Sequence, residues 1–160
     1  MAHTNFLFLL KFHPFLVKGI LVFGDTKMKK IEHIGVAVED IVKAKKIFST
    51  IFGKEPYKTE EVISEKIKAT FFKIGESKIE LLSATNTDSP IAKFLSKNRE
   101  GIHRIAFAVE DIKKEMARLK KEGIRFLNET PKTGANNKLI CFLHPKDTAG
   151  VLIELCQGKE

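Results

Sequence analysis

Three side chains in this sequence have the types and the setting of ligands for a divalent metal ion: His33, Glu80 and Glu154. Each glutamate interrupts an otherwise apolar, strand-like run, in Ile79-Glu80-Leu81 and in Ile153-Glu154-Leu155. Because alternate residues of a strand point to opposite faces, each carboxylate must project away from its apolar neighbours. One imidazole and two carboxylates on a common surface suit Co, Mn, Ni or Zn alike.

The two glutamates occupy the same place in two copies of an internal repeat. His33-Ile-Gly-Val-Ala-Val-Glu-Asp-Ile41 returns as Arg104-Ile-Ala-Phe-Ala-Val-Glu-Asp-Ile112, with six of nine positions identical. A lone histidine at the start of a strand is usually structural, and a lone glutamate in a strand usually faces solvent. The same carboxylate in both copies is harder to attribute to chance, and it favours a metal site.

The hydrophobic pattern predicts the elements that would position these side chains. Each copy alternates apolar and polar residues and then changes, at a Glu-Asp pair, to a Lys-rich segment with helical spacing. We therefore expect two β-α-β-β-β modules, at about 28–84 and 100–157, in one α+β domain whose curved mixed sheet surrounds one cavity. The predicted strands are 30–38, 56–63, 66–74, 77–83, 102–109, 124–128, 138–144 and 150–156, and the predicted helices are 40–52, 91–98 and 111–122.

Composition limits the classes of function. The chain has 160 residues, of which 43% are hydrophobic and 30% are charged, values that are ordinary for one globular domain. Its net charge of +8 comes from lysines scattered along the chain, without the stripe of interleaved arginines and aromatic residues that is typical of nucleic-acid surfaces, so we expect no nucleic-acid partner. Cys141 and Cys156 lie in apolar runs without CxxC spacing, which predicts buried thiols in a reducing, cytoplasmic compartment.

Residues 1–27 differ in composition from the rest of the chain. Their apolar stretches, Phe6–Leu10 and Phe15–Phe23, are broken by lysines, a histidine and a proline. They lack the continuous apolar core of a secretory signal and the roughly 20 uninterrupted apolar residues of a membrane span, so we expect no membrane partner. We predict that translation starts at Met28 and that the extension is a misassigned start; a targeting or membrane-association segment is the alternative.

Two stretches carry a specific resemblance, Asp88-Ser-Pro-Ile-Ala92 and Leu143-His-Pro-Lys146, and four more accompany them at 31–38, 78–82, 101–107 and 150–155. From about Met28 to Gln157 the chain resembles the vicinal oxygen chelate (VOC) superfamily, and within it the methylmalonyl-CoA epimerase family. The first two stretches favour the epimerases over the glyoxalase I enzymes of the same superfamily.

The resemblance implies a metal-dependent exchange of stereochemistry at C2 of methylmalonyl-CoA. In this family a divalent metal ion stabilises the enolate that forms when the acidic proton leaves. The family's metal ligands match His33, Glu80 and Glu154, and Glu154 is also placed to exchange the proton as a catalytic base. The resemblance further implies an acyl-CoA substrate and a homodimer.

Two parts of the substrate site are less defined by the sequence. The expected opening of the cavity is bordered by Lys138, His144 and Lys146, which would bind the CoA arm. Alternatively, His144 is only a loop residue before a proline. Some relatives have a second carboxylate base on the strand that corresponds to Lys68-Ala-Thr70, but Ala69 occupies that place here. The sequence therefore does not identify the second base.

The sequence departs from the family pattern at Arg104, where the family has a second histidine ligand. A guanidinium has no lone pair to donate to a metal. A group of charge +1 about 4 Å from an ion of charge +2 also costs roughly 8 kcal/mol at an effective dielectric constant near 20.

Three outcomes are open at this position. Arg104 turns outward and leaves the metal to the other three ligands, or a bulge at Ile102-His103 brings His103 into the site. In the third outcome Arg104 pairs with Glu80 and Glu154 in place of the metal, which would make the chain a metal-free binding protein or an inactive paralogue. Another VOC metalloenzyme, such as a glyoxalase or an extradiol dioxygenase, is a further alternative, but it should lack the two epimerase stretches.

Overall fold

The computed structural model describes residues 15–17, 20–22, 28–134 and 137–158. The first repeat folds as β3 (Met28–Ala37), α1 (Ile41–Phe52), β4 (Lys58–Val62), β5 (Ile67–Ile74) and β6 (Ser77–Ala84). The second repeat folds as β7 (Gly101–Val109), α3 (Ile112–Lys121), β8 (Lys132–Thr133), β9 (Leu139–Phe142) and β10 (Leu152–Gln157). Each repeat is therefore a β-α-β-β-β module, here called the first and the second module.

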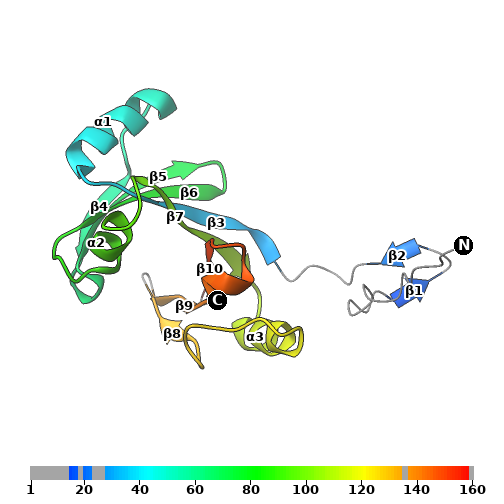
Figure 1. The fold of residues 1–160 in the computed structure, drawn as a ribbon. Helices are drawn as coiled ribbons and strands as arrows, with labels where there is room; N and C mark the ends of the chain where they lie inside the picture. The colour runs from blue at the N-terminus through cyan, green and yellow to red at the C-terminus, as the bar shows by residue number, and fades with distance from the viewer. Residues whose placement is uncertain (1–14, 18–19, 23–27, 135–136, 159–160) are drawn as a thin grey trace, which may run out of the picture.

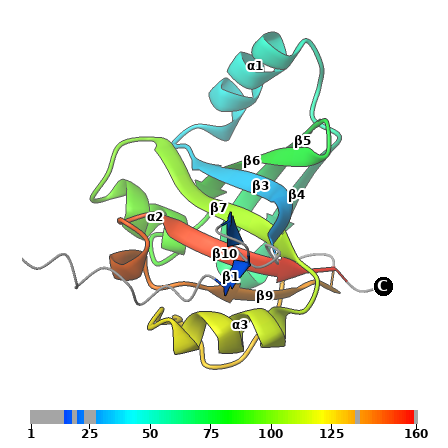
Figure 2. The ribbon, with the colours of Figure 1, turned by 90° about the vertical axis from the view of Figure 1, so that its right-hand side faces the viewer.

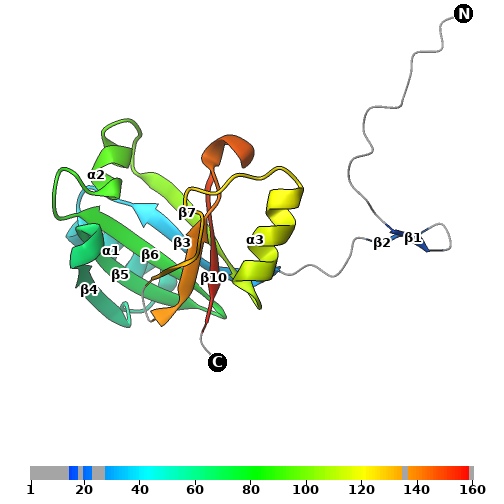
Figure 3. The ribbon, with the colours of Figure 1, turned by 90° about the horizontal axis from the view of Figure 1, so that it is seen from below.

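The eight strands of the two modules form one mixed sheet in the order β4-β5-β6-β3-β7-β10-β9-β8 (Figure 1). Within each module the first strand pairs parallel with the last, β3 with β6 and β7 with β10. The modules join through the antiparallel pair of β3 and β7, in which His33 lies opposite Ala106 and Gly35 opposite Arg104. The predicted α+β fold with a curved mixed sheet is confirmed (Figure 3).

One predicted strand is wrong. In the range 124–128 only Phe126 forms an isolated bridge, to Leu143, and the edge strand of the second module is the short β8. Two backbone hydrogen bonds of 2.8 Å flank this bridge, from Leu127 N to Phe142 O and from His144 N to Arg125 O. The ladder stops there because the backbone N of Phe142 donates to Oδ1 of the Asn128 side chain, at 3.2 Å. A hydrogen bond to the Asn128 side chain thus takes the place of the next backbone hydrogen bond between this stretch and β9.

The Glu-Asp pair that recurs in the sequence ends the first strand of each module and begins the helix. The side chain of Asp40 accepts hydrogen bonds from the backbone N of Val42 and Lys43, and that of Asp111 accepts one from Lys114. These N–H groups have no partner inside the helix, so a short acidic side chain at this place stabilises its start. The repeated motif is therefore explained by helix capping.

The two helices of the modules cover the outer face of the sheet at its two ends (Figure 2). Helix α1 packs over buried Phe72 and Leu81, and α3 packs over Cys141 and Leu155. A third helix, α2 (Pro90–Leu95), joins the modules and contributes the buried Ile91 to a separate cluster on the other face. The centre of the concave face is left for the side chains of a site.

Of residues 1–27, only β1 (Phe15–Val17) and β2 (Ile20–Val22) are described, and they pair antiparallel. The rest of this segment, on which the predicted translation start depends, lies outside the described residues. No helix in the described ranges is long and apolar enough to cross a membrane.

Candidate active site

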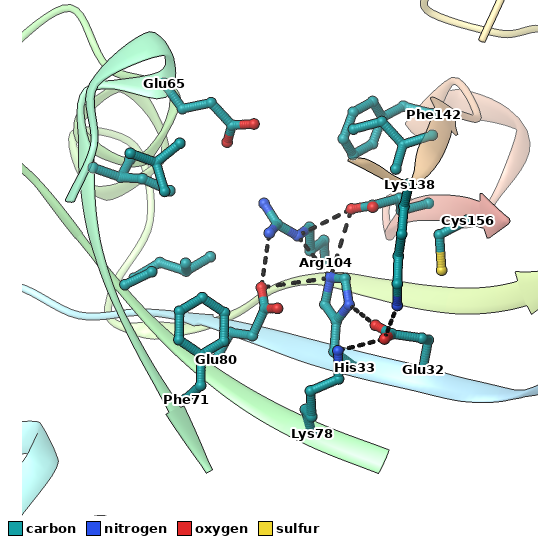
Figure 4. Close-up of a pocket in the computed structure, with 16 residues that line it drawn as sticks. Glu32, His33, Glu65, Phe71, Lys78, Glu80, Arg104, Lys138, Phe142 and Cys156 are labelled. Atoms are coloured by element: carbon teal, nitrogen blue, oxygen red, sulfur yellow. Dashed lines mark hydrogen bonds and ion pairs between the residues drawn. The ribbon is translucent and has the colours of Figure 1, made fainter. Parts of the chain in front are cut away.

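The concave face of the sheet encloses a small cavity where the two modules meet (Figure 4). Its volume is about 50 Å³, which holds one or two water molecules. Charged side chains lie at its centre, and apolar side chains of both modules form its walls. The lining residues are Glu32, His33, Val62, Glu65, Ile67, Ala69, Phe71, Lys78, Glu80, Leu82, Arg104, Lys138, Ile140, Phe142, Glu154 and Cys156.

The structure brings His33, Glu80 and Glu154 together at the centre of this cavity. They come from β3, β6 and β10, and each is at most 6% exposed. In the sheet Glu80 pairs with Gly35 and Glu154 with Ala106, which are equivalent positions of the two modules. His33 Nε2 lies 3.5 Å from Glu80 Oε2 and 3.6 Å from Glu154 Oε2. The side chains that the repeat places on one face thus converge.

Arg104 reaches into the same centre from β7. Its Nη2 donates to Glu80 Oε2 at 2.9 Å, and its Nε lies 3.2 Å from Glu154 Oε2 and 3.2 Å from His33 Nε2. Burial by itself lowers the pKa of Arg104, but the charges of Glu154, Glu80 and Glu65 outweigh it and raise this pKa. The guanidinium is therefore charged, and the structure has the arrangement in which Arg104 pairs with both glutamates.

This arrangement does not fit a divalent metal ion. The guanidinium contacts the three atoms that would coordinate the ion, Nε2 of His33 and Oε2 of each glutamate, and it has no lone pair of its own. Its charge also repels a cation placed among these atoms. Among the residues that the structure describes, no group of three or more His, Cys, Asp or Glu side chains could hold a metal.

Glu32 is a site residue that a strict alternation along β3 misses. Ile31 pairs with Phe107 and His33 with Ala106, so β3 has one residue more than β7 at this point. Such a β-bulge turns two successive side chains toward one face. Glu32 consequently lines the cavity beside His33, although alternation alone would place it on the opposite face. No residue type in the sequence signals this bulge.

Glu32 holds three cationic or polar partners inside the cavity. Its carboxylate forms ion pairs with Lys78 and Lys138 and lies 2.5 Å from Nδ1 of His33. Burial raises the pKa of Glu32, but the hydrogen bonds from His33, Lys138 and Lys78 outweigh burial and hold this pKa far below its usual range. Glu32 therefore stays ionised and fixes the orientation of the His33 ring.

The protonation of His33 depends on opposing neighbours. Burial lowers its pKa, whereas hydrogen bonding to Glu154 and Glu32 and the charge of Glu80 raise it, to about 9. The hydrogen bond from Arg104 Nε requires an unprotonated Nε2 on the ring. These two observations describe different states of the ring. With a pKa of about 9 the ring is protonated on both nitrogens at neutral pH, whereas the contact with Arg104 belongs to the neutral ring that carries its proton on Nδ1, facing Glu32, so that protonation of His33 breaks the contact with Arg104.

His103 does not enter the cavity. A second bulge does occur here, since Gly35 pairs with Arg104 while Val36 pairs with Ile102. Even so, the ring of His103 packs edge-on against Phe94 at 5.1 Å, and its Nδ1 has no hydrogen-bond partner. Burial and the charge of Arg104 lower its pKa to about 4. The bulge at Ile102-His103 that the sequence analysis considered is therefore present, but it does not turn His103 into the site.

The residues predicted for the substrate opening separate in the structure. Lys138 lines the cavity through its ion pair with Glu32. His144 instead precedes the short 3-10 turn η3 (Pro145–Asp147), where its Nδ1 accepts a hydrogen bond from the backbone N of Lys146 at 3.2 Å. Neither His144 nor Lys146 is among the residues that line the cavity. His144 therefore acts locally as a loop residue before proline, the alternative given for it from the sequence.

Two further residues reach the cavity without having been predicted. Glu65, in the 3-10 turn η1 (Ile63–Glu65), projects toward Arg104 from the side opposite β3 (Figure 4). Cys156, from β10, lines the cavity on the side of the second module. Burial raises the pKa of its thiol to about 12, so the thiol is not a nucleophile at neutral pH. Glu65 lies in a turn, whose side-chain direction no periodicity predicts.

Residues 32–142 match the family model of the Glyoxalase/Bleomycin resistance protein/Dioxygenase superfamily. The chain therefore belongs to this superfamily, the glyoxalase or VOC class that the paired modules define.

Within this class the chain is a homologue of methylmalonyl-CoA epimerases. The human mitochondrial methylmalonyl-CoA epimerase is 40% identical over 130 residues, which are 81% of this chain and 74% of the human protein. The methylmalonyl-CoA epimerase of Mycobacterium tuberculosis has a TM-score of 0.79 at 30% identity, covering 87% of this chain and 94% of the other. A methylmalonyl-CoA epimerase in complex with methylmalonyl-CoA and NH4+ has a TM-score of 0.76 at 35% identity, covering 82% of this chain and 95% of that one. The resemblance to the epimerase family is confirmed.

Proposed function

We propose that this chain epimerises methylmalonyl-CoA at C2. The observation that carries the proposal is the position of Glu154, a carboxylate only 4% exposed that projects into the cavity beside a fixed positive charge. A buried carboxylate can remove a proton from carbon, and an adjacent cation stabilises the resulting anion. The relatives named as methylmalonyl-CoA epimerases, one of them bound to methylmalonyl-CoA, support this substrate.

The chemistry requires a base, an acid and a positive charge. The proton at C2 is acidic because C2 lies between a thioester carbonyl and a carboxylate. Glu154 takes this proton, the electron pair of the C–H bond moves into the bond between C1 and C2, and negative charge passes to the thioester oxygen. Return of a proton to the opposite face of the planar enolate gives the other epimer.

The metal ion that the resemblance implies is not part of this proposal. His33, Glu80 and Glu154 would hold it, and it would stabilise the enolate. The contacts of Arg104 with the same donor atoms oppose such a site. The positive charge beside Glu154 therefore belongs to the chain itself.

Glu65 is our candidate for the acid on the opposite face. The other cavity carboxylates are held, since Glu32 binds two lysines and Glu80 binds Arg104. No ion pair of Glu65 is found within the described residues, although its charge acts on Arg104 from across the cavity. The turn before β5 would thus supply the carboxylate that Ala69 does not provide on the strand.

A metal-free binding protein without activity is the second candidate. The ion pairs of Arg104 favour it, because they occupy Glu80 and Glu154, the carboxylates that a metal ion or a proton transfer would need. The volume of the cavity does not separate the two candidates, because about 50 Å³ is below the roughly 300–1,000 Å³ of common small-ligand pockets and the cavity would have to open in either case. A binding protein in which Arg104 stayed paired with Glu80 and Glu154 when the ligand bound would not exchange the proton.

Deuterium exchange tests the proposed function. The protein is incubated with methylmalonyl-CoA in deuterated buffer, and incorporation at C2 and inversion are followed by proton NMR. We expect exchange with the natural chain and a loss of about 100-fold or more in Glu154→Gln. Glu76→Gln is the matched control, because Glu76 forms an exposed ion pair with Lys30 and lies outside the cavity.

A comparison of deuterium incorporation at C2 with inversion of C2 also distinguishes a one-base from a two-base mechanism. In Glu65→Gln, Glu154 should still exchange the C2 proton for deuterium. Inversion should fall, because the acid on the opposite face is missing. Saturable binding of methylmalonyl-CoA by calorimetry without any exchange would contradict the epimerase and favour the binding protein.

A further inference from the structure

We propose that Arg104 is the resident cation of this site, that it replaces a divalent metal ion, and that it binds the oxygen on which negative charge develops. The first part concerns the binding properties of the chain alone. The second part rests on the proposed epimerase function.

The first argument is the convergence of contacts on one guanidinium. Two carboxylates and one imidazole nitrogen, from three different strands, lie within 3.2 Å of Nε or Nη2 of Arg104. These are donor atoms that would otherwise surround a metal ion. The guanidinium neutralises part of the charge of Glu80 and Glu154, which is the electrostatic role that a metal would have.

The second argument is that the fold makes room for this side chain. Gly35 lies opposite Arg104 in the pair of β3 and β7. A Cβ at Gly35 would lie 3.0 Å from Arg104 Cγ and 3.5 Å from Arg104 Nε. The absence of a side chain on β3 thus lets the arginine lie flat across the sheet and reach β6 and β10.

The third argument is that part of the guanidinium remains available. An arginine has five N–H donors, and the contacts of Arg104 within the described residues use Nε and Nη2. The side chain is 13% exposed, and Figure 4 shows its end directed to the side of the cavity where Glu65 lies. The N–H groups of Nη1 can therefore donate to an oxygen of a bound thioester.

Charge balance makes this position effective during the reaction. Before proton transfer, Glu154 is an anion paired with Arg104. When Glu154 takes the proton from C2, it becomes neutral and the enolate oxygen becomes the anion. The charge of Arg104 then has a new partner within the same cavity, and no charge is created or lost. Stabilisation of such an oxygen by fixed donors is usually worth about 100- to 1,000-fold in rate.

The first experiment measures metal binding without any substrate. The natural chain, Arg104→His and Arg104→Gln are incubated with Co²⁺, desalted and assayed by elemental analysis, with titration calorimetry in parallel. We expect no stoichiometric cobalt in the natural chain and in Arg104→Gln, and about one ion per chain in Arg104→His, because histidine adds a fourth donor and removes the charge. Arg99→His, at an exposed position, controls for a histidine added elsewhere.

The second experiment measures C2 exchange in the same variants with and without EDTA. We expect exchange by the natural chain to resist EDTA and exchange by Arg104→Gln to fall about 100-fold in kcat/KM. Arg104→Lys should restore part of the rate, whereas a merely structural role would show in thermal unfolding and not in the rate. Exchange by Arg104→His should become dependent on added metal.

The outcomes are distinguishable. One tightly bound cobalt per natural chain would overturn the proposal. Cobalt bound only by Arg104→His, together with no exchange in any variant, would support the resident cation but refute both its catalytic part and the proposed epimerase function. EDTA-sensitive exchange by the natural chain would support the epimerase and refute the role of Arg104.

Discussion

The two modules share a fold but differ at the residue that faces the cavity from the first strand. His33 in the first module and Arg104 in the second occupy equivalent positions, and both strands carry a bulge at the preceding residue. In the first module the bulged residue, Glu32, enters the cavity and binds His33. In the second, the bulged residue, His103, packs against Phe94 instead.

This difference separates what holds the fold from what makes the site. Helix caps at Asp40 and Asp111 and the parallel pairing of first and last strands are the same in both modules. The polar side chains on the concave face are not the same. An imidazole from one module therefore meets a guanidinium from the other, and the site is asymmetric within a nearly symmetric sheet.

The largest expected effect comes from removing the charge that the second module supplies. Arg104→Met leaves Glu80 and Glu154 buried without their cation, and it should lower the free energy of unfolding by about 3–5 kcal/mol. His33→Met, at the equivalent place, removes a hydrogen-bonded ring and should cost only about 1–3 kcal/mol. Urea denaturation of both variants provides the comparison.

A double variant checks the cause of that effect. In Arg104→Met combined with Glu80→Gln, part of the lost stability should return, because one of the two unpaired charges is removed. Equal stability of the single and double variants would mean that the ion pair with Glu80 does not explain the cost.

The next effect concerns the bulged residue of the first module. Glu32→Gln preserves the shape of the side chain but removes the charge that Lys78 and Lys138 share, so we expect a loss of about 1.5–3 kcal/mol in unfolding free energy. The ring of His33 also loses a charged acceptor on Nδ1. Glu76→Gln, which breaks an exposed pair with Lys30, should change stability by less than about 1 kcal/mol in the same denaturation assay.

A third comparison substitutes the small residues two positions after His33 and Arg104, which are Gly35 and Ala106. Gly35→Ala places a methyl group 3.0 Å from both Arg104 Cγ and Leu82 Cδ1, and it should cost about 1–3 kcal/mol in stability and displace the guanidinium. Ala106→Gly, at the equivalent place, should cost about 0.5–1 kcal/mol without affecting C2 exchange. Equal exchange rates in both variants would show that Gly35 does not position Arg104.

The caps should behave alike in the two modules. Asp40→Ala and Asp111→Ala each remove a side chain that accepts backbone hydrogen bonds at the start of a helix, and each should cost about 1 kcal/mol. Thermal unfolding measures both. A large difference between the two variants would mean that capping is not the shared reason for the repeated Glu-Asp motif.

The sequence predicts most of the fold because alternation and capping are local. Asp40, Asp111 and Gly53 mark helix limits through contacts with their own neighbours, and the strand faces follow from a period of two. The missing strand at 124–128 is a tertiary effect, since Asn128 satisfies the backbone of β9 with its side chain. Local pattern has no means of predicting that contact.

The site is predicted only in part for the same reason. Convergence of His33, Glu80 and Glu154 follows from alternation and from the repeat. Glu32 was missed because a bulge breaks the alternation, and the inward direction of Arg104 depends on three partners that meet it only in the folded sheet. The predicted homodimer and the cytoplasmic location stay predictions.

The smallest effect should come from His103, the bulged residue of the second module. Its Nδ1 is buried without a hydrogen bond, and its ring lies against Phe94, so a leucine of similar reach loses little and removes an unsatisfied polar atom. We expect His103→Leu to be neutral or up to about 1 kcal/mol more stable in denaturation, with an unchanged C2 exchange rate. If His103→Leu instead reduced exchange tenfold or weakened cobalt binding in the Arg104→His background, the bulge would turn His103 into the site after all. The two bulges would then be functionally alike, and the asymmetry between the modules would reduce to the exchange of His33 for Arg104.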